Sequence, residues 1–343
     1  MDLVAILSKA LTTALSTAKL PPAKTGITAS TSIADLAALA AQSGLPIDRW
    51  LSQAALASYG AKRGTGKRAA RDGLEFYEAD KRPAAPSLVF TNDPEVKWSL
   101  PAKTILAAVQ NANRAIELID DLATGNETPI FTLLGLRNLS SFVGEILASE
   151  LFRLEKKRLL PNPNQDGYPD LLALTPKGEK YVEEREKKGE MTEKKFWSPF
   201  PYGGIEVKAT CGNVVSASVQ AKPKIGESRL PTLVSAEWKA HHRETNNLLG
   251  IFWDFVDEIP TVLAAFYRND LRIHHWGEVV KPKEGGGKTT SVSIMTRTGV
   301  KFMGEGWVVL PKPPAYRNVI CQRKVFNVTD TSMSLACSAW KPQ

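Results

Sequence analysis

Two short segments in the middle of the chain combine charged side chains with residues typical of β-strands. They are Tyr168-Pro169-Asp170-Leu171-Leu172 and Gly204-Ile205-Glu206-Val207-Lys208-Ala209. Because side chains alternate along a strand, Glu206 and Lys208 are expected on one face and the apolar residues between them on the other. Asp170 opens the other strand, so two carboxylates and one ammonium group can converge where the strands diverge. Burying such charges without a function is costly.

These are the groups that hydrolysis of a phosphodiester bond requires. The carboxylates of Asp170 and Glu206 are suitable ligands for a hard divalent cation, preferably Mg²⁺. The cation neutralises charge on the phosphate and activates water. Lys208 stabilises the developing charge or orients the attacking water in this interpretation. Glu145, on a predicted helix upstream, completes the metal shell or orients a ligand.

The order Pro169-Asp170 … Glu206-Val207-Lys208, preceded by Gly144-Glu145, resembles the motif of the PD-(D/E)XK nuclease superfamily, and within it that of type II restriction endonucleases. The resemblance covers roughly residues 130–270. It implies an α/β fold: a restriction-endonuclease-like core with a central mixed β-sheet flanked by helices. It also implies metal binding by Asp170 and Glu206 and catalysis involving Lys208. Thirty-six positions separate Asp170 from Glu206, so we expect residues 177–195 to be an insertion.

The activity implied by the resemblance is Mg²⁺-dependent, site-specific cleavage of double-stranded DNA. Such enzymes commonly act as homodimers, because a palindromic site has two-fold symmetry. Two alternatives stay open. One is a nuclease of the same superfamily that serves repair or recombination and prefers junctions, flaps or ends. The other is a non-catalytic DNA-binding protein with a nuclease-like core, against which the intact Asp170, Glu206 and Lys208 argue.

The charge balance favours a polyanionic partner. The chain has 44 Lys and Arg against 36 Asp and Glu, a net charge of +8, and a basic excess attracts nucleic acid. The candidate DNA-binding residues are Lys62, Arg63, Lys67, Arg68, Lys239, Arg243, Lys288 and Arg297. Residues 62–71 form either a basic loop on the DNA backbone or a solvated charge run. Residues 238–247 form a DNA-facing wall or a capped helix docked on the sheet, and residues 288–297 form a DNA-reading segment or an exposed hairpin.

The pattern of apolar residues predicts two regions. Residues 1–125 form a helical N-terminal region for DNA contact or dimerisation, and residues 126–343 form the nuclease core with DNA-reading elements. Residues 47–59 fit the second helix of an ordinary αα-hairpin or of a helix-turn-helix. Further predicted elements are helices at 101–125 and 131–154, strands at 170–174, 204–210, 213–219, 248–255 and 261–267, a connector at 74–100, and a solvated helix or excursion at 177–195.

Three cysteines without CxxC spacing argue against a disulfide framework and a zinc knuckle. The first residues do not fit a signal peptide, because Asp2 replaces the basic start and Lys9 interrupts a short apolar run. No segment approaches the run of about 20 apolar residues that a membrane helix needs. We therefore expect a cytoplasmic protein that does not contact membranes.

Overall fold

The computed structural model describes residues 69–78, 88–125, 128–215, 222–240, 245–280, 292–321 and 325. The chain divides into two compact units, residues 1–69 with 117–130 and residues 70–116 with 131–343. Most described residues belong to the second, larger unit. The predictions for residues 1–68, including the helix-turn-helix alternative, lie outside the described residues.

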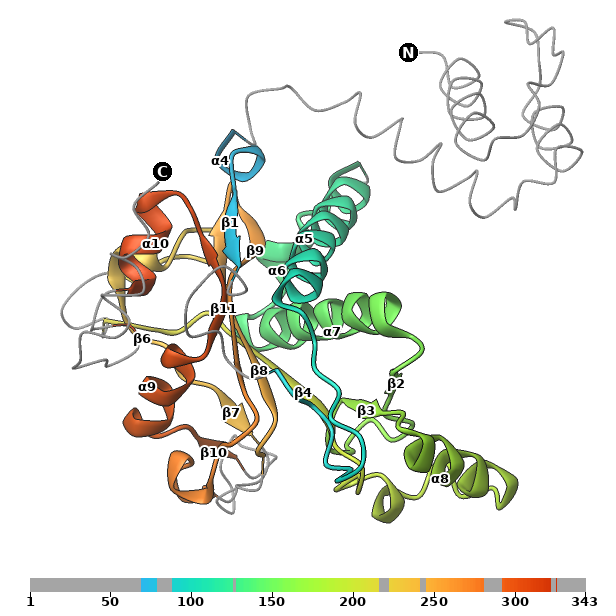
Figure 1. Ribbon diagram of the computed structural model, residues 1–343. Coiled ribbons are helices and arrows are strands. Elements are labelled where there is room, and N and C mark those ends of the chain that lie inside the picture. Colours follow the sequence, from blue (N-terminus) through green and yellow to red (C-terminus); the bar gives the residue numbers. More distant parts are fainter. Residues whose placement is uncertain are drawn as a thin grey trace, which may run out of the picture. The chain divides into compact units, whose positions relative to one another are not determined.

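A seven-stranded sheet forms the centre of the larger unit (Figure 1), with the strand order β1-β11-β9-β8-β4-β3-β2. Its strands are β1 (Phe76–Glu78), β2 (Leu159–Pro161), β3 (Leu171–Ala173), β4 (Gly204–Thr210), β8 (Leu248–Val256), β9 (Ile259–Arg268) and β11 (Trp307–Pro311). Strands β4 and β8 pair in parallel, and the other neighbours pair antiparallel. The protein is thus of the mixed α/β class, with a mixed central sheet, as predicted.

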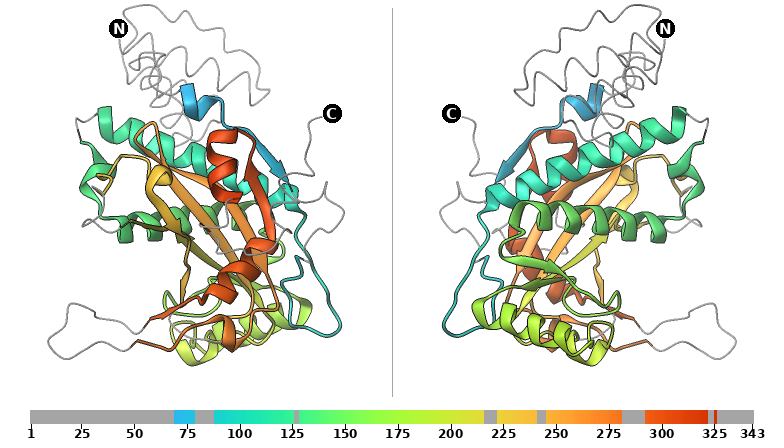
Figure 2. Two further views of the ribbon diagram at one scale, coloured as in Figure 1. Left: turned by 90° about the vertical axis from the view of Figure 1, so that its left-hand side faces the viewer. Right: turned by 90° about the vertical axis from the view of Figure 1, so that its right-hand side faces the viewer.

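Helices cover both faces of this sheet (Figure 2). Helix α7 (Leu136–Glu155) and the first part of α5 (Ala102–Gly125) lie on one face, and α9 (Arg297–Glu305) and α10 (Pro314–Cys321) lie on the other. Helix α7 contacts β4, β8 and β9. Its large buried apolar residues recur every four positions, which produces one apolar stripe towards the sheet. They are Leu139, Val143, Leu147 and Leu151.

The prediction of one helix over residues 131–154 is wrong in one respect. The helix is interrupted after α6 (Ile130–Leu133), and α7 starts at Leu136. Gly135 precedes it with the extended angles φ −67° and ψ 153°. Any residue can adopt these extended angles, so neither Gly135 nor the apolar period of the segment indicated the break.

Most predicted strands are present. Strand β4 has the predicted bounds, and β8 and β9 extend the predicted strands by one to three residues. Every residue of β8 is buried, which accounts for its almost uninterrupted apolar sequence. Of the strand predicted at 213–219, the structure has β5 (Asn213–Val214), which pairs with β6 (Leu233–Ser235), while residues 216–220 lie outside the described part.

The connector predicted at residues 74–100 is not entirely irregular. Strand β1 pairs with β11 at one edge of the sheet, and isolated bridges join Val89 to Ser99 and Thr91 to Gly203. The reason is that an edge strand of three residues is held by its single neighbour and has too few positions to show a period. Its local sequence therefore did not identify it.

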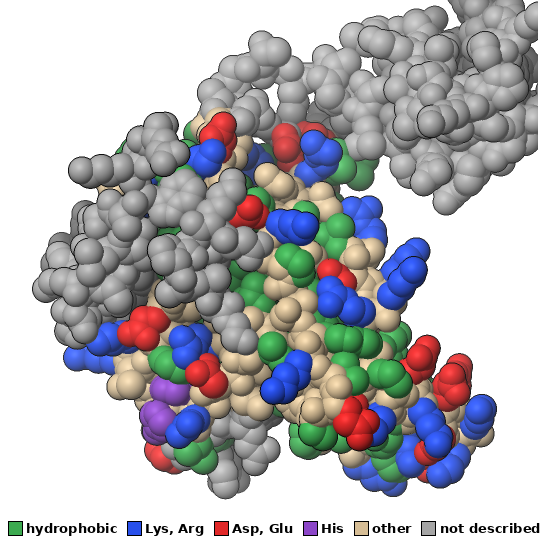
Figure 3. Space-filling view, viewed as in Figure 1, with side chains coloured by type: hydrophobic (Ala, Val, Ile, Leu, Met, Phe, Trp, Pro, Cys, Tyr) green, Lys and Arg blue, Asp and Glu red, His purple; other side chains and the backbone are tan. Residues whose placement is uncertain are grey.

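The charged segment predicted as an insertion contains α8 (Pro176–Lys187) and the short 3-10 helix η2 (Lys194–Phe196). Thr175 caps α8 by accepting a hydrogen bond from the backbone N–H of Gly178 at 3.1 Å. Charged side chains of both signs gather over α8 (Figure 3). Beneath them, Trp197 and Phe200 are buried with Leu172, and Tyr181 packs on this cluster. The insertion thus packs on a small aromatic cluster that also includes Leu172 of β3.

The remaining elements are short. They are α4 (Ala69–Asp72), β7 (Lys239–Ala240), β10 (Ser293–Ile294) and the 3-10 helices η3 (Leu230–Thr232) and η4 (Ile273–His275). Strand β7 pairs with β10, so the capped-helix alternative is wrong for residues 239–240. Residues 241–244 lie outside the described part.

Two further sequence-based predictions concern cysteines and membranes. Cys211 is a buried free thiol, whereas Cys321 is disulfide-bonded, which the cysteine spacing did not predict. Spacing cannot reveal such a bond, because it depends on which residues the fold brings together. Among the described residues, no helix is long and apolar enough to cross a membrane.

Replacement of Gly204, the first residue of β4, tests whether this position requires glycine. Gly204 has φ +148°, and an added Cβ would overlap the carbonyl oxygen of Leu171 on β3. We expect Gly204→Ala to lower the free energy of unfolding by about 2–4 kcal/mol, because it combines a disfavoured backbone angle with a backbone clash. Urea unfolding measures the change. Gly135→Ala is the control, since nothing lies within 4 Å of its Cβ position; equal losses for both variants would contradict the prediction.

Candidate active site

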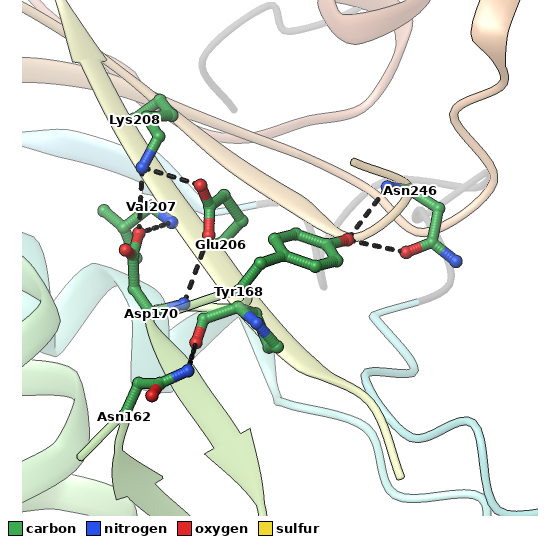
Figure 4. A network of polar contacts seen from close by, with 8 residues as sticks. Asn162, Tyr168, Asp170, Glu206, Val207, Lys208 and Asn246 are labelled. Carbon is green, nitrogen blue, oxygen red and sulfur yellow. Dashed lines mark hydrogen bonds and ion pairs between the residues drawn. The ribbon is translucent and has the colours of Figure 1, made fainter. Parts of the chain in front are cut away.

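The pairing of β3 with β4 brings the two halves of the sequence motif together. Leu171 lies opposite Ile205, and Leu172 lies opposite Gly204. Asp170 directly precedes β3, so this register places it beside Glu206, although 36 positions separate them in the chain. Figure 4 shows both side chains and Lys208 pointing toward one another.

Backbone groups hold both carboxylates in place. The N–H of Asp170 donates to Glu206 Oε2 at 3.1 Å, and the N–H of Val207 donates to Asp170 Oδ2 at 2.7 Å. Each strand thus orients the carboxylate of the other. Hydrogen bonds that backbone N–H groups donate to charged acceptors are stronger than those to neutral ones, so the two side chains have little freedom.

Lys208 completes the group as the alternation of β4 predicts. Its Nζ lies 2.7 Å from Glu206 Oε1 and 3.2 Å from Asp170 Oδ2. The side chain of Glu206 is 6% exposed, and those of Lys208 and Asp170 are 24% and 29% exposed. The site is therefore buried at Glu206 and open to solvent at Asp170 and Lys208.

Burial and like charge govern the ionisation of this group. Burial, followed by the nearby charge of Asp170, raises the pKa of Glu206 to about 7, although Lys208 opposes the rise. For Lys208, burial lowers the pKa, but the charges of Glu206 and Asp170 outweigh it and leave the pKa above its usual value. Lys208 is thus protonated at neutral pH, while the carboxyl group of Glu206 gains or loses its proton near neutral pH.

Glu145 lies within electrostatic range of this group. It is an exposed residue of α7. Partial burial of its carboxyl group and the charge of Asp170 raise its pKa, and Lys208 lowers it. The side chains of Asp170, Glu206 and Glu145 together carry more negative charge than the single ammonium of Lys208 can neutralise. Such an excess favours a cation.

The carboxylates fit a hard divalent cation by their chemistry. Asp170 Oδ1 accepts no hydrogen bond from any described residue, so it has free lone pairs at a partly exposed position. Among the described residues, no group of three or more His, Cys, Asp or Glu side chains is placed to hold a metal. Mg²⁺ commonly uses only one or two carboxylates, with water and substrate phosphate as further ligands. Asp170 and Glu206 are therefore the residues that could hold it.

A second set of residues, missed as site residues in the sequence, fixes the position of this group. Tyr168 is buried; its hydroxyl donates to Asn246 Oδ1 at 2.8 Å and accepts from the N–H of Asn246 at 3.0 Å. The carbonyl of the next residue, Asn247, accepts from the N–H of Glu206. In the sequence, Tyr168 is the residue before Pro169, and Asn246 and Asn247 are a polar pair before β8. Nothing in the sequence indicates that these residues contact each other.

Asn162 holds the other side of the turn that leads to Asp170. Its Nδ2 donates to the carbonyls of Pro169 and Trp197 at 2.9 and 3.0 Å. Its backbone N–H donates to the carbonyl of Asp170 at 2.9 Å. The turn before β3 is thus fixed from two sides, by Asn162 and by Tyr168 (Figure 4).

The described DNA-binding candidates are not part of this group. Lys239 begins β7, Arg297 begins α9, and both are exposed. Within the described residues, neither has a hydrogen bond or ion pair with Asp170, Glu206 or Lys208. The other candidates, Lys62, Arg63, Lys67, Arg68, Arg243 and Lys288, lie outside the described residues.

Two neighbours of Arg297 in this segment have structural roles. Ser293 is buried and donates to the carbonyl of Gly277 at 2.7 Å. Thr296 is the N-cap of α9 and accepts from the N–H of Gly299. Both belong to a polar segment whose composition is compatible with a folded turn and with a DNA-reading surface alike.

The chain matches no protein-family model, no curated protein and no solved structure.

The ionisation of Glu206 predicts a pH dependence of stability. Because its pKa rises from the ordinary glutamate value of 4.5 to about 7 in the folded protein, the folded state retains the proton longer than the unfolded state. This contribution is complete below pH 4.5 and is lost as the pH rises to about 7. We expect the free energy of unfolding, measured by urea with EDTA present, to fall across this window relative to that of Glu206→Gln. Parallel curves for the two proteins would contradict this prediction.

Proposed function

We propose that this protein is a Mg²⁺-dependent endonuclease that cleaves double-stranded DNA at specific sites. The observation that carries the proposal is the convergence of Asp170, Glu206 and Lys208 from two adjacent strands, with Lys208 Nζ within 3.2 Å of both carboxylates. Two carboxylates with a neighbouring ammonium are the groups that phosphodiester hydrolysis needs. The group lies on two adjacent strands of a mixed sheet, and a mixed central sheet is what the resemblance implies.

The roles follow from the position of each side chain. Asp170 and Glu206 would hold the cation, and the cation supplies charge neutralisation at the phosphate when bound. Lys208 remains protonated and partly exposed, so it can place a positive charge against a phosphate oxygen. Glu145 is near enough to influence Asp170 and Lys208 electrostatically, which supports a role in orienting a ligand or water.

The choice of DNA rests on the charge balance and on the resemblance. The net charge of +8 favours a polyanion, and the exposed Lys239 and Arg297 are available for phosphate contacts. A homodimer is part of the proposal, because two active centres related by a two-fold axis cut both strands of a palindromic site.

The carboxylates provide the direct test. We expect Asp170→Asn or Glu206→Gln to abolish Mg²⁺-dependent cleavage, since each substitution removes a metal ligand while keeping the shape of the side chain. DNA affinity should be kept or increased, because less negative charge faces the phosphates. Asp166→Asn is the matched control: the residue is exposed in the same turn, and its substitution should leave the rate unchanged. Near wild-type cleavage by the Asp170 variant would remove the central claim.

The cleavage pattern decides between classes of function. Phage DNA incubated with the protein and Mg²⁺ should give discrete bands, measured on a gel. A smear would indicate a nonspecific nuclease, and uncut DNA would indicate a binding protein without activity.

Lys208 has a separate prediction. We expect Lys208→Ala to reduce the single-turnover cleavage rate by about 10²–10³-fold, since a preorganised charge contributes strongly to stabilisation of the transition state. Lys208→Arg should not restore the full rate, because the guanidinium is larger and planar and cannot supply a compact charge at the same point. If both variants cleave at the normal rate, Lys208 has only a structural role.

A further inference from the structure

Lys208 binds the same oxygen atoms that a cation would need. Its Nζ contacts Glu206 Oε1 at 2.7 Å and Asp170 Oδ2 at 3.2 Å. Both contacts come from one ammonium group that lies between the two carboxylates (Figure 4). In this structure, therefore, the positive charge that joins the two acids is supplied by the chain itself.

The hydrogen bonds of the two acids limit where a second cation can bind. Glu206 Oε2 is held by the backbone N–H of Asp170 at 3.1 Å, so the oxygen of Glu206 without a backbone partner is Oε1. That is the atom that Lys208 binds. Asp170 still has Oδ1, whereas both oxygens of Glu206 already accept a hydrogen bond, one from the backbone and one from Lys208. A cation that binds between the two acids would occupy the position of the ammonium group, so it competes with Lys208 there.

The two positive charges cannot share this position at low cost. An ammonium group and a divalent cation on the same oxygen repel strongly where the surroundings are buried and of low dielectric constant. The ammonium is at the end of a flexible four-carbon chain, and the side chain is 24% exposed. It can leave without any change in the backbone of β4.

We propose that Lys208 is an internal substitute for the divalent cation, holding the two carboxylates together in the metal-free protein and being displaced when a cation binds. This inference rests on the proposed function, since it concerns the same site. It adds an order of events: cation binding releases the ammonium group, which then becomes available to a phosphate. The free protein therefore binds divalent cations weakly, because each binding event must first break the contacts of Lys208.

The experiment measures cation binding in the absence of DNA. Calorimetric titration with Ca²⁺ should give about tenfold or more tighter binding for Lys208→Met than for the wild type, since loss of about 1.4 kcal/mol of competition is a tenfold change. Methionine keeps much of the length of the side chain but removes its charge. The matched control is Lys177→Met, which breaks the 2.9 Å ion pair between Lys177 on α8 and Glu95 and should change the affinity by less than about twofold. Asp170→Asn should abolish binding in either background.

A second measurement uses the unaltered protein and stays informative if the Lys208 variant does not fold. Acetylation of lysines by a water-soluble reagent, followed by mass spectrometry, compares Lys208 with Lys177 with and without saturating Ca²⁺. Displacement should increase the labelling of Lys208 at least severalfold and leave that of Lys177 unchanged.

The outcomes separate this inference from the proposed function. Equal or weaker Ca²⁺ binding by Lys208→Met, or unchanged labelling of Lys208 at saturation, overturns the inference; the proposed function survives if Asp170→Asn loses binding and the wild type cleaves DNA. If neither the wild type nor Lys208→Met binds Ca²⁺, the inference and the proposed metal site both fail.

Discussion

The hydrogen-bonded pairing of β3 with β4 is the constraint on which the rest of the site depends. The register that puts Leu171 opposite Ile205 also lets each strand bind the carboxylate of the other through a backbone N–H. A shift of one residue would turn Glu206 and Lys208 to the opposite face of the sheet and separate them from Asp170. The geometry of the three charged groups is thus a property of the backbone as much as of the side chains.

Strand β8, the other neighbour of β4 in the sheet, also supports the pair of β3 and β4. Strand β8 runs parallel to β4, with Leu248 beside Glu206, and the segment before β8 supplies Asn246 to Tyr168 and Asn247 to Glu206. The turn that carries Asp170 and the strand that carries Glu206 are therefore held by two consecutive asparagines, Asn246 and Asn247 respectively. Tyr168 and Asn247 are buried and Asn246 is partly buried, so most of this support is shielded from solvent.

Local sequence was sufficient for the features that depend on local order. The alternation in residues 204–210 predicts β4 and the shared side of Glu206 and Lys208, and the structure has both. The bounds of α5 follow in the same way from its apolar period and Pro101. Features that depend on residues far apart in the chain could not be predicted from the sequence, because they exist only through contacts that the fold creates. Tyr168 and Asn246 are 78 positions apart, and β1 is defined by its pairing with β11.

The insertion between the two halves of the motif leaves and re-enters the sheet at neighbouring points. The N–H of Ala173 donates to the carbonyl of Gly203 at 3.1 Å, so the chain closes a loop of roughly 30 residues with its two ends in contact. The entropy of closing a loop changes only slowly with its length, and the aromatic cluster around Trp197 stabilises this loop from within. The number of residues between Asp170 and Glu206 is consequently free to change during evolution, or by design, while the register of β3 and β4 is kept. Two proteins with this arrangement can therefore share the same three charged groups and yet differ widely in motif spacing.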